Sequence, residues 1–230
     1  MTVPEGLLNE GSEMFVSQPV GTLTGALKVP GDKSISHRAL LLSAVAEGKS
    51  SIHGFLNSDD CLATLAVLRA IGVEINSKGS DVHVFGVGSR GLRAASAPLD
   101  LGNSGTAVRL LAGVLSAQSF DSILTGDDSL RNRPMERLAV PLRLMGASIE
   151  TQEGQAPLGI QGGQQLKGID YTLPVASAQL KSALLIAGLW ADGRTIVRSP
   201  APSRDHTERM LESMGVVVDQ YDDHVVSLSG

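Results

Sequence analysis

Small, hydroxyl and basic residues gather in this sequence where helices are expected to begin. Three such segments precede long apolar runs: Asp32-Lys33-Ser34, Gly102-Asn103-Ser104-Gly105-Thr106 and Ser177-Ala178-Gln179. The first residues of a helix leave backbone N–H groups without partners in the helix, so such segments can bind an anion. Positive charge follows each segment closely, on Arg38, Arg109 and Lys181. The chemistry predicted is recognition of an anionic ligand, such as a phosphorylated compound.

Two further segments repeat this arrangement, Arg131-Asn132-Arg133-Pro134 and Ser203-Arg204-Asp205-His206. Pro134 is expected as a first helical residue, where its missing N–H costs nothing. Any one of these segments can be read as an ordinary helix cap with solvated cations. As a set they favour a ligand, because cations at helix N-termini oppose the helix dipole and need compensation.

The helices that carry these segments belong to a threefold repeat. Three helical patterns end at Gly72, Gly146 and Gly215, each a candidate left-handed residue that ends a helix. Their apolar stripes are expected at Cys61, Leu65, Leu68 and Ile71, at Met135, Leu138, Leu142 and Met145, and at Met210, Leu211 and Met214. Pro141 inside the second stripe predicts a kink or a broken hydrogen bond.

Each repeat is completed by strands. A hairpin is expected after each of these glycines, and a short strand before each first helix, at residues 27–29, 99–101 and 171–175. The sequence therefore predicts an α/β (α+β) chain of three pseudo-symmetric βαβαββ units, at about residues 24–92, 97–163 and 168–230. We expect these units to form one globular domain over residues 23–230. Residues 1–22 are expected to form a flexible tail and a first strand that would belong to another domain.

Composition and charge exclude several functions. The net charge of −5 argues against nucleic acid as a partner, since binding its backbone needs a basic face. No apolar stretch approaches the roughly 20 residues that span a bilayer, and residues 1–15 do not resemble a signal peptide. Cys61 is the only cysteine, so no disulfide forms within the chain. We expect a cytoplasmic monomer.

Other motifs in the sequence favour structural readings. Gly86-Val87-Gly88-Ser89-Arg90-Gly91 matches a dinucleotide-binding fingerprint, but Pro98 follows too soon for the helix that this fingerprint must open, which favours a loop. Gly48-Lys49-Ser50 is interpreted as a helix end and turn rather than a phosphate-binding loop. Asp59-Asp60 is expected in the first turn of a capped helix. The five histidines lack metal-ligand spacing, so no metal site is predicted.

Taken in order, the segments resemble the signatures of the 5-enolpyruvylshikimate-3-phosphate (EPSP) synthases. The matching residues are Gly31–Leu40, Leu101–Arg109, Arg133-Pro134, Ser177–Gln179 and Ser203-Arg204. The resemblance runs from about residue 20 to the end of the chain. It implies the enolpyruvyl transferase fold and transfer of the enolpyruvyl group of phosphoenolpyruvate to the 5-hydroxyl of shikimate 3-phosphate, with release of phosphate and no metal or organic cofactor.

The resemblance also implies roles for individual residues, with Lys33 as a catalytic residue that faces both substrates. The shikimate 3-phosphate ligands would be Lys33, Ser34, Arg38, Ser177, Ala178, Gln179, Ser203 and Arg204. The phosphoenolpyruvate ligands would be Lys33, Asn103, Gly105, Arg133 and Gln179. Glyphosate is a further expected ligand, although Ala178 and Leu110 resemble tolerant enzymes and Gly105 resembles sensitive ones.

The resemblance covers an amino-terminal half, and it places the remaining ligands and the acidic catalytic residues in a carboxy-terminal half. We therefore expect this chain alone to bind shikimate 3-phosphate without turnover. One alternative is the related transferase that acts on UDP-N-acetylglucosamine, which usually has a Cys in the loop corresponding to residues 127–132 and a Lys-Asn pair where Lys33-Ser34 stands. Another alternative is a non-catalytic binding module that needs a separate carboxy-terminal partner.

Overall fold

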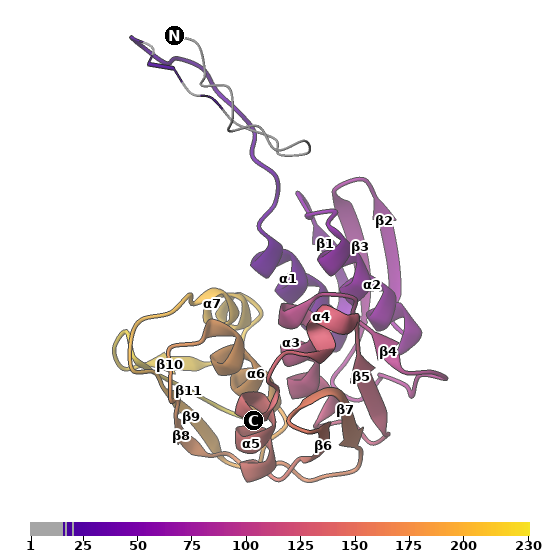
Figure 1. Cartoon of the computed structure of the whole chain (residues 1–230). Coiled ribbons are helices and arrows are strands. Elements are labelled where there is room, and N and C mark those ends of the chain that lie inside the picture. The colour runs from indigo at the N-terminus through magenta and orange to yellow at the C-terminus, as the bar shows by residue number, and fades with distance from the viewer. Residues whose placement is uncertain (1–15, 17, 20) are drawn as a thin grey trace, which may run out of the picture.

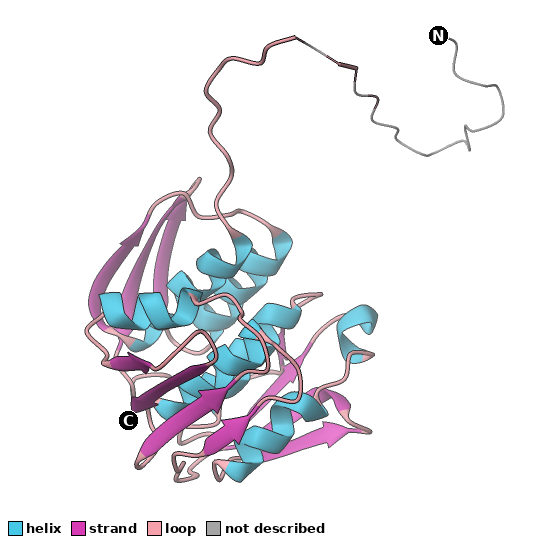
Figure 2. Cartoon of the chain, turned by 90° about the vertical axis from the view of Figure 1, so that its left-hand side faces the viewer, coloured by secondary structure: helices cyan, strands magenta, loops and turns pink. Residues whose placement is uncertain are grey.

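The computed structural model describes residues 16, 18, 19 and 21–230, so most of the tail expected at residues 1–22 lies outside it. The described residues form an α/β arrangement of helices packed between three small sheets (Figures 1 and 2). The prediction of an α/β fold is confirmed. None of the helices in this part of the chain is long and apolar enough to cross a membrane.

The first group of elements contains two helices and a sheet of three antiparallel strands in the order β1-β3-β2. In chain order its elements are α1 (Lys33–Val45), β1 (Glu47–Ile52), α2 (Asp59–Ala70), β2 (Glu74–Lys78) and β3 (Asp81–Val87).

The second group has a four-stranded sheet in the order β4-β5-β7-β6, in which β4 and β5 are parallel. Its elements are β4 (Leu99–Asp100), α3 (Gly105–Leu115), β5 (Ser122–Thr125), α4 (Asp128–Arg131), α5 (Glu136–Leu144), β6 (Ser148–Gln152) and β7 (Gln155–Gln161).

The third group repeats this topology in the order β8-β9-β11-β10, again with its first two strands parallel. Its elements are β8 (Asp170–Thr172), α6 (Ala178–Gly188), β9 (Arg194–Arg198), α7 (His206–Ser213), β10 (Val218–Gln220) and β11 (Val225–Ser229).

The helix ends follow the repeat. Gly72, Gly146 and Gly215 adopt φ values of 97°, 101° and 90°, so all three occupy the left-handed conformation that ends a helix. This confirms the alignment of the three helical patterns on which the repeat was predicted. The exact bounds of the three units, and the assignment of residues 1–22 to another domain, stay predictions.

The strand expected at residues 27–29 is wrong. Residues 22–32 form neither helix nor strand, and Leu27 and Val29 are 85% and 71% exposed. In the other two groups the first strand pairs in parallel with the strand that follows the first helix. Within the described residues β1 pairs only with β3, so the edge of β1 where an equivalent first strand would pair stays open, and the segment makes no ladder hydrogen bonds.

Three local predictions also need correction. Pro134 precedes α5 by two positions rather than opening it, since Met135 is the N-cap and the helix begins at Glu136. Gly48-Lys49-Ser50 lies inside β1 rather than in a turn. Met214 is 41% exposed, since the short α7 buries Thr207, Glu208 and Leu211 instead of a longer apolar stripe.

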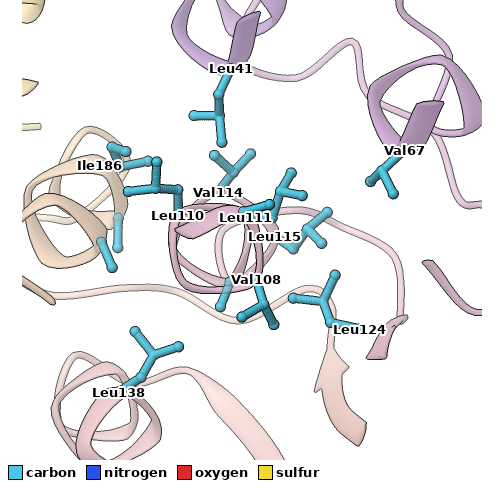
Figure 3. Packing of buried hydrophobic residues seen from close by; sticks show 14 of the residues in the cluster. Leu41, Val67, Val108, Leu110, Leu111, Val114, Leu115, Leu124, Leu138 and Ile186 are labelled. Carbon is cyan, nitrogen blue, oxygen red and sulfur yellow. The ribbon is translucent and has the colours of Figure 1, made fainter. Parts of the chain in front are cut away.

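The core is centred on α3, which the other groups surround. Figure 3 shows Leu110, Leu111 and Val114 of α3 between Leu41 of α1 and Ile186 of α6. All of these side chains are at most 1% exposed. Burial of such a leucine contributes about 1.5–3 kcal/mol, so this contact fixes α1, α3 and α6 against one another.

A polar contact joins the first and third groups beyond the C-terminal end of α6. The indole Nε1 of Trp190 donates a hydrogen bond to the backbone oxygen of Ser89 over 2.9 Å. Ser89 lies in the Gly86–Gly91 segment, whose first two residues end β3 and whose other residues form a loop; the segment opens no helix, as predicted.

Candidate active site

The N-terminal ends of the helices α1, α3, α6 and α7 lie close together. Arg204, just before α7, donates from Nη1 to Ser34 Oγ in the first turn of α1 over 3.1 Å. At the start of α3, Arg109 Nη1 donates to Gln179 Oε1, in the first turn of α6, over 3.1 Å. Ser104, the N-cap of α3, lies 3.5 Å from His37 of α1, measured from Oγ to Nε2. The core packing therefore brings together the helix starts that the sequence analysis selected.

Side-chain caps explain why the helices begin at these points. Asp32 accepts a hydrogen bond from the backbone N–H of Ile35, Ser104 from that of Ala107, and Ser177 from that of Leu180. Each cap satisfies one N–H of the first turn and leaves others free. The three segments predicted to bind an anion thus have the same local structure.

Lys33 is the first residue of α1 and its ammonium group forms an ion pair with Asp60 of α2. Nζ lies 2.8 Å from Asp60 Oδ2, and the Lys33 side chain is half exposed. Asp60 also occupies the first turn of α2 behind the N-cap Ser58, as predicted. Lys33 is therefore held at the surface of the site by one carboxylate while keeping donors available to a ligand.

Arg38 lies beneath the surface of the site. Its guanidinium donates from Nε to Thr207 Oγ1 over 2.7 Å, from Nη1 to Ser34 O over 2.9 Å and from Nη2 to Ser182 Oγ over 2.8 Å. The residue is only 2% exposed. Burial lowers its pKa, and the carboxylate of Glu208 opposes that shift. Arg38 thus joins α1 to α6 and α7 from inside.

Next to Arg204, Ser203 has a buried hydroxyl group. Its Oγ has no hydrogen-bond partner among the described residues. A hydroxyl buried without a partner costs free energy, so this group is expected to gain one when a ligand binds. Arg204 itself is exposed beside it.

Three guanidinium groups gather at the start of α3. Arg133 donates from Nη2 to Asn103 Oδ1, and Arg109 donates from Nη1 to Gly105 O over 2.7 Å. Burial lowers the pKa of Arg109, and the charges of Arg133 and Arg137 lower it further. No carboxylate in the described part of the chain forms an ion pair with any of the three arginines. This arrangement attracts an anion.

Gly105 provides the space for this cluster. A Cβ added there would lie 2.6 Å from Arg133 Nη1 and 2.7 Å from Arg109 Nη1. The absent side chain lets both guanidinium groups lie against the first turn of α3, where Arg109 donates to the Gly105 oxygen.

The buried His37 lies under the site in neutral form. Its Nδ1 is 2.8 Å from Thr64 Oγ1, and burial lowers its pKa from 6.5 to about 4. Across residues 16, 18, 19 and 21–230, no group of three or more His, Cys, Asp or Glu side chains is arranged to hold a metal ion.

Comparison with known proteins identifies the family. Residues 17–230 match the model of the EPSP synthase (3-phosphoshikimate 1-carboxyvinyltransferase) family. The chain belongs to the EPSP synthase family. This match favours the shikimate enzyme over the related transferase that acts on UDP-N-acetylglucosamine.

Individual relatives agree with this assignment. The chain is 54% identical over 225 residues to a 3-phosphoshikimate 1-carboxyvinyltransferase of Methylococcus capsulatus, covering 97% of this chain and 52% of the relative. It is 61% identical over 208 residues to one of Alkalilimnicola ehrlichii, covering 90% and 47%. A solved EPSP synthase from Acinetobacter baumannii superposes with a TM-score of 0.87 at 55% identity, covering 90% of this chain and 47% of that structure. The chain thus spans about half the length of the relatives it matches.

The structure places all of the residues expected from EPSP synthases at these helix starts, in two neighbouring groups. One group joins α1 to α6 and α7 and contains Lys33, Ser34, Arg38, Ser177, Ala178, Ser203 and Arg204. The other surrounds the start of α3 and contains Asn103, Gly105, Arg133 and Gln179. Arg38 differs from the rest because its guanidinium is enclosed by protein groups.

Sequence reasoning missed several residues that hold these side chains in place. Asp60 was interpreted only as a first-turn acid, although it also pairs with Lys33. Ser182, Thr207 and Glu208 surround Arg38 and Lys181 and were not selected at all. One signal in the sequence could have pointed to Glu208. Lys181 lies within an apolar helix, where a buried lysine needs a carboxylate partner from another element.

Proposed function

We propose that this chain is the amino-terminal half of an EPSP synthase and provides one side of its active site. The reaction transfers the enolpyruvyl group of phosphoenolpyruvate to the 5-hydroxyl of shikimate 3-phosphate and releases phosphate. The observation that carries the proposal is the meeting of four helix starts with an arginine cluster that has no carboxylate partner in the described part of the chain. Both substrates are anionic, so this site matches their charge.

The shikimate 3-phosphate site is assigned to the group around Ser34. Arg204 offers a planar fork of donors to the phosphate, and Ser203 offers its unpartnered hydroxyl. Ser177, Ala178 and Gln179 present the first turn of α6 to the same ligand. Arg38 acts beneath them by fixing Ser34 from behind.

The phosphoenolpyruvate site is assigned to the group around Gly105. Arg133 binds its carboxylate or phosphate with two parallel hydrogen bonds, and Asn103, Gly105 and Gln179 line the same space. Lys33 is a compact charge that faces both ligands. Glyphosate, which is also anionic, is included in this proposal as a ligand of the second site.

Catalysis in this proposal depends on fixed charge and positioning. The reaction passes through a tetrahedral addition intermediate, whose charge Lys33 and Arg133 stabilise from preset positions. Proton transfer needs acid and base groups, and we assign these to the carboxy-terminal half. The chain alone is therefore expected to bind shikimate 3-phosphate without turnover, as a cytoplasmic monomer that needs no metal or organic cofactor.

A titration followed by reconstitution tests this proposal. Shikimate 3-phosphate added to the chain should shift the NMR signals of Ser34, Ser177 and Arg204, and a separately produced carboxy-terminal half should then restore phosphate release from phosphoenolpyruvate. No shift at these residues would remove the site assignment. Turnover by the chain alone would refute the division of the catalytic groups.

A further inference from the structure

A buried ion pair joins α6 to α7 behind the proposed shikimate 3-phosphate site. Lys181 Nζ lies 2.5 Å from Glu208 Oε1, and the two side chains are 8% and 2% exposed. The second carboxylate oxygen of Glu208, Oε2, is buried and has no hydrogen-bond partner among the described residues. Two charges buried with incomplete hydrogen bonding cost about as much as their attraction returns. Stability alone is therefore a poor reason for this pair.

The pair lies directly beside a second link between the same two helices. Thr207 precedes Glu208 in α7, and its Oγ1 donates to Ser182 Oγ, which follows Lys181 in α6, over 2.7 Å. Thr207 Oγ1 also accepts the hydrogen bond from Arg38 Nε. The ion pair and the two hydroxyl groups together hold the first turn of α7 against α6, and Arg38 enters this joint from α1.

Glu208 also compensates positive charge where α6 and α7 meet α1. Of the charged groups that act on the pKa of Arg38, Glu208 has the largest effect and raises it, while Arg204 lowers it. One carboxylate thus faces Lys181 and offsets the charge of Arg38, with Arg204 close by. Without it, three cations would repel one another where α1, α6 and α7 meet.

A small cavity connects the pair to the proposed phosphate ligand Ser203. The cavity has a volume of about 240 Å³, and Lys181, Ser203 and Glu208 are among the residues that line it. On this side Ser203 therefore borders open space, which the Lys181–Glu208 pair also lines, together with Val225 and Val226.

We propose that Glu208, held by Lys181, is a positioning residue for shikimate 3-phosphate: it fixes the start of α7 so that Arg204 reaches Ser34 of α1, with Ser203 beside it. This inference rests on the proposed function for its ligand. Its structural part, the fixed position of Arg38 and α7, can be measured without any ligand.

The decisive variant replaces both charges with side chains of similar size, Lys181→Met with Glu208→Met. Removal of a whole buried pair is often neutral or stabilising, so this variant should fold with an unchanged or higher Tm. We expect shikimate 3-phosphate to bind about tenfold more weakly, the effect of one displaced charged hydrogen bond. We also expect the Arg38 Nε–H signal in NMR to exchange faster with solvent.

Glu208→Gln provides a second variant, which keeps the size of the side chain and an acceptor for Lys181 but removes the charge. It should lower the Tm, weaken binding by about the same factor and speed the exchange at Arg38. The matched control is Arg198→Gln with Asp170→Asn, which removes the exposed pair between β9 and β8 of the same group of elements. An exposed pair contributes little, so the control should retain its affinity and Tm.

Each outcome decides the inference. Unchanged affinity together with unchanged exchange at Arg38 in either folded variant would overturn it, as would an equal loss of affinity in the control. If the unmodified chain does not bind shikimate 3-phosphate while exchange at Arg38 rises in both variants, the proposed function fails and the positioning role of the pair stands.

Discussion

Arg204 donates a hydrogen bond to Ser34 although 170 positions of sequence separate the two residues. The contact joins the first turn of α1 to the segment just before α7 and forms one edge of the proposed shikimate 3-phosphate site. Because Arg204 is exposed and its partner is a hydroxyl, the contact is weak as a source of stability and well suited to exchange for a ligand.

Arg204→Gln should weaken shikimate 3-phosphate binding by about ten- to hundredfold, since a charged hydrogen bond contributes about 1.5–3 kcal/mol. The Tm should hardly change, because the side chain is exposed. Isothermal titration of the chain provides the measurement. Arg209→Gln is the control, since it removes one charge from α7, just after Arg204, while leaving the Ser34 contact intact. Equal losses in both variants would show a general field effect rather than a direct contact.

Gly105→Ala should weaken phosphoenolpyruvate binding by about tenfold without unfolding the chain, because the added methyl group displaces the ends of two flexible arginine side chains. Binding is measured in the presence of shikimate 3-phosphate. Gly113→Ala in the same helix is the contrasting variant. There the methyl group would lie 2.5 Å from the backbone oxygen of Ala183 in α6, and we expect a loss of about 1–3 kcal/mol of stability. Unchanged phosphoenolpyruvate affinity in Gly105→Ala would contradict the assigned site.

His37 should make the stability fall as the solution becomes acidic. Its pKa is about 4 in the folded chain and 6.5 as the ordinary value, so below pH 6.5 the unfolded state binds a proton that the folded state does not. The associated stability is complete above pH 6.5 and is lost between pH 6.5 and pH 4, by about 3 kcal/mol. Urea unfolding at several pH values measures it. In His37→Gln this part of the pH dependence should disappear, and an identical slope in both proteins would be evidence against it.

Cys61 should react with thiol reagents only when the chain unfolds. The side chain is 0% exposed, and burial raises the pKa of its thiol, so little thiolate is available in the folded state. Alkylation by iodoacetamide, followed by mass spectrometry, should be slow in buffer and fast in urea. Rapid alkylation in buffer would reveal local opening of α2 where it faces Lys33.

The repeat made much of the site predictable. Gly72, Gly146 and Gly215 aligned the three units, and that alignment made the starts of α1, α3 and α6 equivalent before any contact was known. The caps of Asp32, Ser104 and Ser177 depend on residues three positions apart, so local sequence was sufficient to predict them.

Long-range partners could not be predicted in the same way. Lys33 and Asp60 are 27 positions apart, and the pairing of Lys181 with Glu208 depends on how α7 packs against α6. The strand expected at residues 27–29 failed for a similar reason. An extended segment becomes a strand only when another strand accepts its hydrogen bonds, and its own sequence does not reveal that neighbour.

Trp190, whose indole joins the end of α6 to the loop after β3, can serve as a fluorescent probe of ligand binding. It is the only tryptophan in the chain, so its fluorescence comes from a single known place. The eleven residues of α6 separate it from the proposed site by about 16 Å. A ligand bound at the helix starts cannot touch the indole directly. Any change in its emission therefore reports, without an added label, motion that reaches the indole through α6 or through the loop at Ser89.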